Sequence, residues 1–313
     1  MLRCVRMREG CETMGFFDSA QGMIDKGVSA AKGVVSGVAV EQQPFMKGFA
    51  RLCADGWDQG WHERNGGNLT YRMTEGEVTD CRPFFRENPS NWIPLGVQAD
   101  NLRGAFFAAT GAGCYLRNVA LDIARNVGIV EINASGDACR VVWGLKDGGR
   151  PTSEFPSHFM IHSVRLDATG GASRILYHAH PTNVVALTSV MPLDARVITR
   201  ALWKVMTECI IAFPKGVGVV PWMVPGGSEI AMATAKLMGT YDAVIWAQHG
   251  LFCSGADFDS AFGLMHTIEK AADIYVRARL LNGGGDFANT ISDDGLRAIA
   301  RDLRLDVNET FLD

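Results

Sequence analysis

The chain has 313 residues, of which 47% are hydrophobic and 20% charged, and its formal net charge is -4. A chain of this size can bury the core of one large domain or two smaller ones, and its weak acidity argues against nucleic acid or an anionic membrane as the main partner. The longest apolar runs, such as residues 216–220, are far shorter than the ~20 residues of a membrane span, and the first residues lack the apolar segment of a secretion signal.

The cysteines are scattered along the chain and include no Cys-x-x-Cys pair. This distribution is typical of buried thiols in a reducing compartment, so we expect no disulfides and a cytoplasmic protein. The cysteines are Cys4, Cys11, Cys53, Cys81, Cys114, Cys139, Cys209 and Cys253.

Residues 1–43 differ from the rest of the chain. Apolar residues recur every three or four positions from Phe17 to Val38, with charged residues between them, which is the pattern of an amphipathic helix. The segment is rich in glycine and valine, which are weak helix formers, and it ends in a linker-like stretch. Two interpretations stay open: a peripheral extension, or a docking helix that binds a groove on another protein. Residues 44–313 are expected to form one domain.

The first part of this domain is expected to be a helix, a small-residue loop and a surface segment. Apolar residues spaced three or four apart predict a core-facing helix over residues 45–63. In Asn65-Gly66-Gly67-Asn68, two glycines let the backbone approach a ligand and turn its N–H groups toward an anion. The same residues are also a common tight-turn signal, so this motif alone does not distinguish an anion-binding loop from an ordinary turn. Residues 75–95, with several prolines, are expected to be a long surface excursion.

A second small-residue turn, Gly111-Ala112-Gly113, follows a predicted buried strand at residues 105–110. A hairpin is expected next, with strands at residues 127–132 and 139–145. Pro151-Thr152-Ser153-Glu154 then opens a helix, for which Thr152 or Ser153 is the expected N-cap. The free amides of that helix end attract an anion, and Glu154 can equally be an ordinary favourable charge there.

Three histidines stand at the ends of predicted strands. His178 and His180 end the strand that begins at Ile175, and because alternate strand residues share a face, their imidazoles point the same way. His249 ends a buried strand at residues 242–249, directly before a glycine. Three imidazoles, with a carboxylate or water in fourth position, suit a tetrahedral Zn²⁺ that keeps a place for substrate. A histidine at a strand end is also often a hydrogen-bonded core residue, so the spacing alone leaves both interpretations open.

The remaining pattern predicts the fold class. Strands and helices alternate without the regular spacing of βαβ units, which indicates a single α/β/α domain with a central mixed, mostly antiparallel sheet covered by helices. Further helices are predicted at residues 183–190, 194–209, 227–238, 257–281 and 292–303, and further strands at residues 217–222 and 251–253.

Several short motifs occur in a specific order and spacing over about residues 44–300. They are Glu63-Arg64-Asn65-Gly66-Gly67-Asn68-Leu69-Thr70, Thr110-Gly111-Ala112-Gly113, Arg117-Asn118-Val119, Pro151-Thr152-Ser153-Glu154, His178-Ala179-His180-Pro181-Thr182-Asn183, Thr207-Glu208-Cys209, Pro221-Trp222-Met223-Val224-Pro225-Gly226 and His249-Gly250. No one of them suffices, but together they resemble the class II, zinc-dependent sugar-phosphate aldolases of the aldolase/epimerase/adducin-like family. The resemblance is strongest to the branch that acts on L-rhamnulose 1-phosphate.

The resemblance implies a function and a set of site residues. The implied reaction is the reversible retro-aldol cleavage of L-rhamnulose 1-phosphate to dihydroxyacetone phosphate and L-lactaldehyde by Zn-stabilised enediolate chemistry. One Zn²⁺ per subunit would lie on His178, His180 and His249, with Glu154 as the catalytic base. Glu208 would reach the neighbouring subunit's site in a homotetramer. The phosphate would lie among Gly67, Asn68, Thr110, Gly111, Thr152 and Ser153, with Asn65 in the same substrate loop.

Two residues depart from the family pattern. Ala112 stands where close relatives usually carry serine, and Cys114 where a basic residue is usual; the missing hydroxyl costs roughly 1 kcal/mol of phosphate binding. Other members of the family act on L-fuculose 1-phosphate or epimerise ribulose 5-phosphate, and these reactions stay as alternatives. A non-catalytic adducin-like scaffold is a remote alternative, because all three histidines and Glu154 are present.

Overall fold

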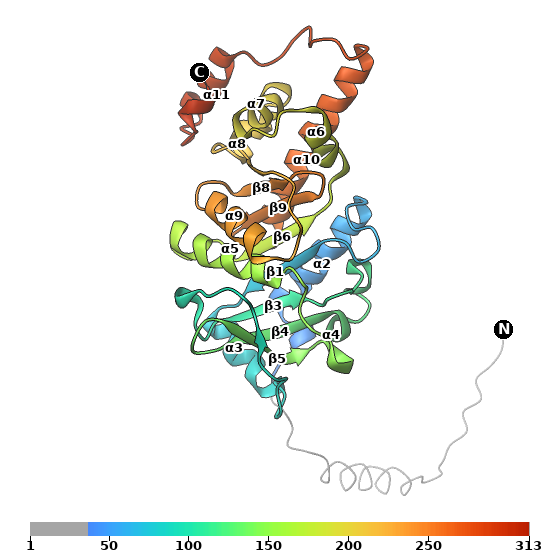
Figure 1. Ribbon diagram of the computed structural model, residues 1–313, viewed down its shortest axis with the longest axis vertical. Coiled ribbons are helices and arrows are strands. Elements are labelled where there is room, and N and C mark those ends of the chain that lie inside the picture. Colours follow the sequence, from blue (N-terminus) through green and yellow to red (C-terminus); the bar gives the residue numbers. More distant parts are fainter. Residues whose placement is uncertain (1–36, 313) are drawn as a thin grey trace, which may run out of the picture. The chain divides into compact units, whose positions relative to one another are not determined.

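The computed structural model describes residues 37–312 of the chain (Figure 1). The amphipathic helix predicted before residue 37 lies outside the described residues. One nine-stranded sheet runs through them in the order β2-β5-β4-β3-β1-β6-β9-β8-β7. Its neighbouring strands are antiparallel, except that β7 and β8 are parallel. The predicted mixed, mostly antiparallel sheet is confirmed.

The strands are short, and the central ones are buried on both faces. The predicted hairpin is present as β4 and β5. The strands are β1 (Asn68–Arg72), β2 (Ile93–Pro94), β3 (Phe106–Thr110), β4 (Val127–Ile132), β5 (Ala138–Gly144), β6 (Ile175–Ala179), β7 (Gly218–Val220), β8 (Ala243–Trp246) and β9 (Gly250–Gly255).

Helices pack on both faces of the sheet. On one face, α2 (Pro44–Asp58) and α10 (Phe258–Leu281) share a core with every second residue of the strands, such as Leu69 and Tyr71 of β1. On the other face lie α5 (Phe155–Ala168) and α9 (Ser228–Met238). The period-two alternation of the strands therefore separates two cores, as expected for an α/β/α arrangement.

Aromatic packing fixes α5 against the sheet. Phe107 of β3 is fully buried and meets the rings of Phe155 and Phe159 edge-on, at centroid distances of 5.9 and 6.3 Å. Burying a side chain of this size contributes about 1.5–3 kcal/mol. Because these rings flank the N-terminal turn of α5, they also hold that turn beside the ends of β1 and β6.

Residues 75–95 lie mostly at the surface, as predicted, but the prediction missed the regular structure within them. The segment contains α3 (Glu75–Cys81) and strand β2. Thr74 and Glu77 form a capping box, in which the Thr74 hydroxyl accepts from the Glu77 N–H and the Glu77 carboxylate accepts from the Thr74 N–H. A Thr-x-x-Glu signal therefore outweighs the prolines that follow it.

Two predicted helices also have different bounds. The predicted helix at residues 45–63 ends at Asp58, shortly before Gly60 takes a positive φ of 77°. The predicted helix at residues 194–209 is two helices, α7 (Ala195–Val205) and α8 (Glu208–Ala212), because Met206 is extended. The other helices are α4 (Ile123–Asn126), α6 (Thr182–Val190) and α11 (Asp293–Asp302), and the 3-10 helices are Val40–Gln42, Arg82–Phe84, Asp100–Leu102, Leu116–Asn118, Lys146–Gly148 and Glu309–Phe311.

The part of the chain that the structure describes contains no helix with both the length and the apolar character needed to cross a bilayer. Its six described cysteines are all free, and most are buried.

Candidate metal centre and active site

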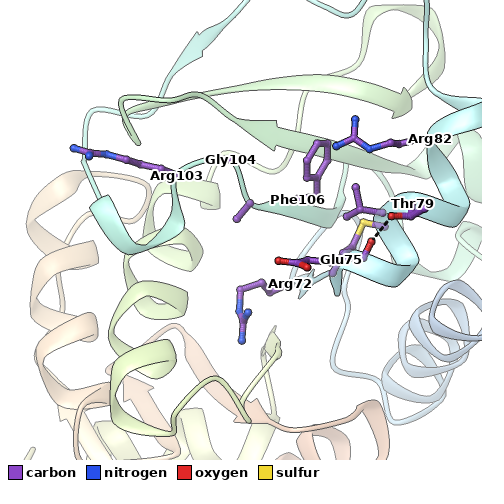
Figure 2. Close-up of a pocket in the computed structure, with 10 residues that line it drawn as sticks. Arg72, Glu75, Thr79, Arg82, Arg103, Gly104 and Phe106 are labelled. Atoms are coloured by element: carbon purple, nitrogen blue, oxygen red, sulfur yellow. Dashed lines mark hydrogen bonds between the residues drawn. The ribbon is translucent and has the colours of Figure 1, made fainter.

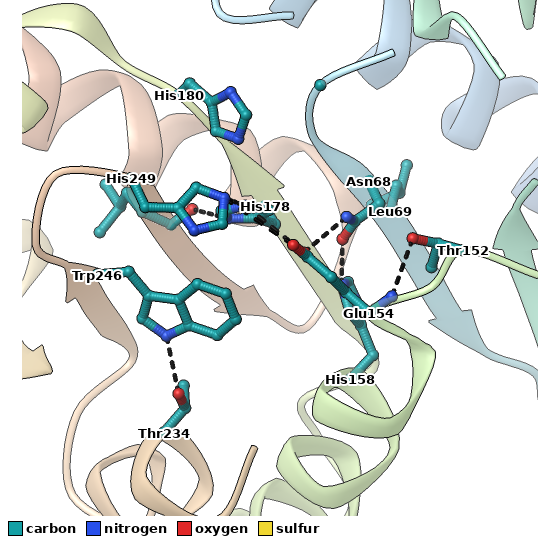
Figure 3. A network of polar contacts seen from close by, with 12 residues as sticks. Asn68, Leu69, Thr152, Glu154, His158, His178, His180, Thr234, Trp246 and His249 are labelled. Carbon is teal, nitrogen blue, oxygen red and sulfur yellow. Dashed lines mark hydrogen bonds and ion pairs between the residues drawn. The ribbon is translucent and has the colours of Figure 1, made fainter. Parts of the chain in front are cut away.

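The three predicted histidines come together beside the ends of β6 and β9 (Figure 3). His178 is the fourth residue of β6, His180 follows that strand, and His249 lies in the turn between β8 and β9. The ring centroids are 5.0–5.1 Å apart in each pair. One ligand atom from each residue lies within 4.8 Å of the others. The histidines that the sequence places far apart thus form one cluster.

The backbone around His249 is shaped to bring it close. Gln248 takes a positive φ of 55°, and both its backbone N–H and its side-chain amide donate to Thr188 of α6, at 2.9 and 2.8 Å. Gly250 leaves room for the rings, because a Cβ there would lie 2.9 Å from carbon atoms of both His178 and His180. The turn that carries His249 is therefore held in place by Thr188, and Gly250 leaves the space that the histidine rings occupy.

Hydrogen bonds set the tautomers of two of the rings. Nδ1 of His178 lies 3.2 Å from the Leu251 carbonyl oxygen, and Nδ1 of His180 lies 2.6 Å from Oε1 of Glu63. Both oxygens can only accept, so each Nδ1 carries a hydrogen, and Nε2 is the atom of each ring that could bind a metal. Nε2 of His180 is buried and has no hydrogen-bond partner in the described part of the chain.

Two rings of the cluster, those of His178 and His249, are neutral at physiological pH. Burial, with the neighbouring His180 and His249, holds the pKa of His178 well below its usual value. Burial and His180 lower the pKa of His249 to about 4. Nε2 of His178 and Nε2 of His249 are 3.3 Å apart, and two ligands of a tetrahedral Zn²⁺ are separated by about 3.3 Å. Three converging ring nitrogens, one of them without a partner among the described residues, fit a divalent transition metal.

Glu154 faces this cluster from the start of α5. It occupies the N-cap position without making a side-chain cap, so the prediction of Thr152 or Ser153 as N-cap is wrong. Its Oε2 lies 3.6 Å from Nε2 of His178, and its Oε1 lies 3.9 Å from Nε2 of His249. Because His178 is neutral, this approach is not a salt bridge. The Glu154 carboxylate therefore does not cap α5 and can interact with a metal or substrate at the histidine cluster.

The environment of Glu154 tunes its proton affinity. Burial raises the pKa of the carboxyl group, while a hydrogen bond from Asn68 and the nearby His180 act in the opposite direction. The Asn68 bond joins Nδ2 to Oε2 of Glu154 at 2.8 Å. Asn68 pairs with His178 across β1 and β6, so both side chains lie on the face that Glu154 approaches. A carboxylate with a raised pKa beside a metal-competent cluster can move a proton.

The loops predicted to hold a phosphate are joined to one another around Glu154. The Thr152 N–H donates to the Thr110 carbonyl oxygen at 2.8 Å, and Gly111 pairs with Pro151. A Cβ on Gly67 would lie 2.8 Å from the His178 carbonyl oxygen, which requires glycine there. The Thr110 hydroxyl is bonded to the backbone of Leu69.

Three other predicted residues are less constrained. Asn65 and Ser153 are exposed on the loops beside the cluster. Glu208 is exposed at the start of α8, and within residues 37–312 it makes no hydrogen bond or ion pair with the cluster. The described chain thus brings the histidines and Glu154 together but does not bring Glu208 to them.

Sequence reasoning missed Glu63, His158 and His162. Glu63 bonds His180 directly, while the two histidines lie behind Asn68, and burial lowers the pKa of His158 to about 3. Glu154, His158 and His162 are spaced four residues apart, which places them on one face of a helix. That spacing was the available signal for the pair on α5.

A separate cavity of about 500 Å³ lies at the other end of β1 (Figure 2). Residues Arg72, Arg82 and Phe106 line it, with Glu75 and Arg103. None of the predicted site residues lines this cavity. The chemistry predicted from the sequence therefore belongs to the histidine cluster at the opposite end of the strand.

Comparisons with known proteins give a consistent result. Residues 47–276 match the family model described as the class II aldolase and adducin N-terminal domain. A rhamnulose-1-phosphate aldolase of Escherichia coli (strain K12 / DH10B) is 42% identical over 262 residues, which cover 84% of this chain and 94% of the relative.

Solved structures with the same fold include a sugar-phosphate aldolase from Thermotoga maritima. Its TM-score is 0.63 at 26% identity, and the match covers 76% of this chain and 94% of that one. An L-fuculose-1-phosphate aldolase from Thermus thermophilus has a TM-score of 0.51 at 20% identity, with 77% and 96% covered. The second likeness concerns the fold alone.

Proposed function

The chain belongs to the class II aldolase and adducin family, and from this membership we propose that it cleaves L-rhamnulose 1-phosphate reversibly to dihydroxyacetone phosphate and L-lactaldehyde. The observation that carries this proposal is the similarity to rhamnulose-1-phosphate aldolases over most of both chains. The convergence of His178, His180, His249 and Glu154 gives that similarity a chemical basis.

We propose that His178, His180 and His249 hold one Zn²⁺ per subunit. When bound, the ion would supply Lewis-acid chemistry to the carbonyl and adjacent hydroxyl oxygens of the ketose phosphate. The support from this chain is the convergence of the three rings, the lowered pKa values of His178 and His249, and the buried Nε2 of His180 that lacks a partner within the described residues.

Glu154 is the proposed general base. Its carboxylate would move a proton to or from the carbon of the dihydroxyacetone phosphate half that becomes nucleophilic. Burial raises its pKa and so brings its proton affinity closer to what a base needs at neutral pH. The hydrogen bond from Asn68 keeps Oε2 oriented, which leaves Oε1 available to the substrate.

The phosphate group would lie against the loops that meet at the start of α5. Gly67 and the N-terminal turn of α5 can offer backbone N–H groups, and the helix dipole favours an anion there. The Gly111 N–H already donates to the Asn126 carbonyl oxygen at 2.8 Å, so Gly111 would mainly shape the pocket. The exposed Ser153 hydroxyl is available for a further bond, and Asn65 and Asn68 border the same space. The Thr110 and Thr152 hydroxyls are engaged within the loops, so these two residues would mainly shape the pocket.

Glu208 would act from a neighbouring subunit of a homotetramer, as the acid or base for the hydroxyl that becomes the aldehyde. Two observations support this proposal. Glu208 is exposed and has no contact with its own cluster among residues 37–312, and large apolar side chains such as Leu121 and Trp222 are exposed, at 82% and 62%. A cytoplasmic location agrees with the free cysteines of the described region.

The substrate is tested by comparing two sugar phosphates. Dihydroxyacetone phosphate release from L-rhamnulose 1-phosphate and from L-fuculose 1-phosphate is followed by coupling to its NADH-dependent reduction. The proposal predicts a kcat/KM at least ten times larger for the rhamnulose substrate. A preference for fuculose phosphate, or release from neither, would move the function to another sugar phosphate.

A further inference from the structure

A continuous line of buried polar side chains runs behind Glu154, from α5 to β1 and back. Figure 3 shows its first part, where Asn68 lies between Glu154 and His158. Nδ2 of Asn68 donates to Glu154, and Oδ1 of Asn68 contacts Nε2 of His158. Nδ1 of His158 is 2.8 Å from the Thr70 hydroxyl, which is also 2.8 Å from Nε2 of His162. We call Asn68, His158, Thr70 and His162 the α5–β1 relay.

The relay follows from the periods of the two elements. Residues four apart on a helix share a face, as do residues two apart on a strand. His158 and His162 of α5 therefore face Asn68 and Thr70 of β1. All four are almost fully buried, with exposures from 0% to 6%. Unpaired polar groups at such depth are costly, so the partners are mutually required.

The direction of every hydrogen bond in the relay follows from Glu154. A carboxylate accepts hydrogen bonds, so Asn68 must turn its NH₂ group toward Glu154 and its oxygen toward His158. That oxygen can only accept, so Nε2 of His158 carries the hydrogen, and in the neutral ring Nδ1 accepts from Thr70. The Thr70 oxygen then accepts from Nε2–H of His162.

A flipped Asn68 is therefore disfavoured. It would place its oxygen against the Glu154 carboxylate, and it would also require the rings behind it to change tautomer so that His158 could accept from its NH₂ group. The relay thus fixes the orientation of the Asn68 side-chain amide, with its NH₂ group toward Glu154 and the histidine cluster. Apart from Glu154 and His158, no described residue makes a hydrogen bond with the Asn68 side chain, so the orientation of its amide depends on His158.

We infer that His158 is a positioning residue that acts through Asn68 to hold the Glu154 carboxylate in its reactive orientation, with Thr70 and His162 completing the hydrogen bonds behind its ring. This inference deepens the proposed function and rests on it for the role of Glu154 as a base. It assigns His158 no contact with substrate or metal. The alternative is that the buried imidazoles only fill space against Phe252 and Phe107, whose rings they contact at 5.4 and 5.0 Å.

A double-mutant cycle separates the two explanations, because only a relay couples His158 to Asn68. The proteins compared are the wild type, His158→Leu, Asn68→Ala and the double variant. Two further variants serve as rescue and control. His158→Gln keeps an amide that can donate to Asn68 and accept from Thr70. Ser157→Ala changes the preceding residue of α5, which is equally buried but whose hydroxyl has no hydrogen-bond partner in the described chain.

The inference predicts a specific pattern in kcat and KM. Without His158, Asn68 loses its fixed orientation and with it the hydrogen bond to the Glu154 carboxylate. His158→Leu therefore lowers kcat by roughly 10- to 100-fold, the usual cost of a lost hydrogen bond to a charged group, while KM changes less than about threefold. In the Asn68→Ala background, His158→Leu lowers kcat by no more than about twofold further. His158→Gln recovers at least half of the lost factor on a logarithmic scale, and Ser157→Ala keeps wild-type kcat. Zinc content stays at the wild-type level in all variants.

Multiplicative losses in the double variant, or equal losses in His158→Leu and His158→Gln, would overturn the inference. The same cycle is measured by urea unfolding of the metal-free proteins, which needs no turnover. If the wild type cleaves no sugar phosphate but the unfolding cycle still shows coupling between His158 and Asn68, the proposed function fails and the relay stands. If the enzyme is active and both cycles are additive, the relay fails and the proposed function stands.

Discussion

Replacing Glu63 by glutamine should weaken zinc binding about tenfold. Oε1 of Glu63 accepts the Nδ1–H of His180 at 2.6 Å, a charge-assisted bond that turns the other ring nitrogen toward the cluster. Removing the partner of a metal-binding histidine typically costs 10- to 100-fold in affinity. The Glu63 side chain is 63% exposed, so solvent screens part of this effect and we expect the lower end, about 1.4 kcal/mol.

The assay is competition for Zn²⁺ with a chromophoric chelator at fixed pH and ionic strength. Glu75→Gln is the matched control, because Glu75 is also exposed and its side chain has no hydrogen bond among the described residues. The control should bind zinc as the wild type does, and both variants should keep the wild-type thermal unfolding temperature without metal. Unchanged zinc affinity in Glu63→Gln would refute the role assigned to this carboxylate.

Three further predictions concern the base, the partner subunit and pH. Glu154→Gln should keep stoichiometric zinc by mass spectrometry while kcat falls by about 10²- to 10⁴-fold; normal turnover would show that Glu154 is not the base. Glu208→Ala should keep zinc but lose turnover, and mixing with an inactive His249→Ala protein should restore activity in mixed tetramers; no restoration would argue against a cross-subunit role. The metal-free protein should lose thermal stability as pH falls from about 6.5 to about 4. Burial lowers the pKa of His62 and His249 to about 4, so over this range the unfolded chain binds protons that the folded chain does not. An unfolding temperature that does not fall between pH 6.5 and 4 in circular dichroism melts would contradict this prediction.

Much of the fold could be predicted from the sequence because its signals are local. The hairpin of β4 and β5, the long helix α10 and the mostly antiparallel sheet follow from alternation and helical spacing. The errors occur where two local signals compete. At residues 75–95 the prolines outweighed the Thr74–Glu77 capping box, and at Met206 a continuous apolar pattern hid the break between α7 and α8.

The site could be predicted in part. The spacing of His178 and His180 and the position of His249 at a strand end indicated a metal site, and the family resemblance supplied the role of Glu154. The tautomers could not be predicted, because they depend on the Leu251 carbonyl group and on Glu63, which approach only in the folded chain. The relay was missed because its order of contacts alternates between two elements that are about 90 residues apart.

The most direct test of the account measures kcat/KM for L-rhamnulose 1-phosphate in three samples of the full chain: as purified, stripped with EDTA, and stripped and then reloaded with Zn²⁺. Zinc content is determined in each sample. The account predicts that dihydroxyacetone phosphate release disappears with the metal and returns in proportion to restored zinc, up to one ion per subunit. Full activity in a sample shown to contain no divalent metal would contradict it.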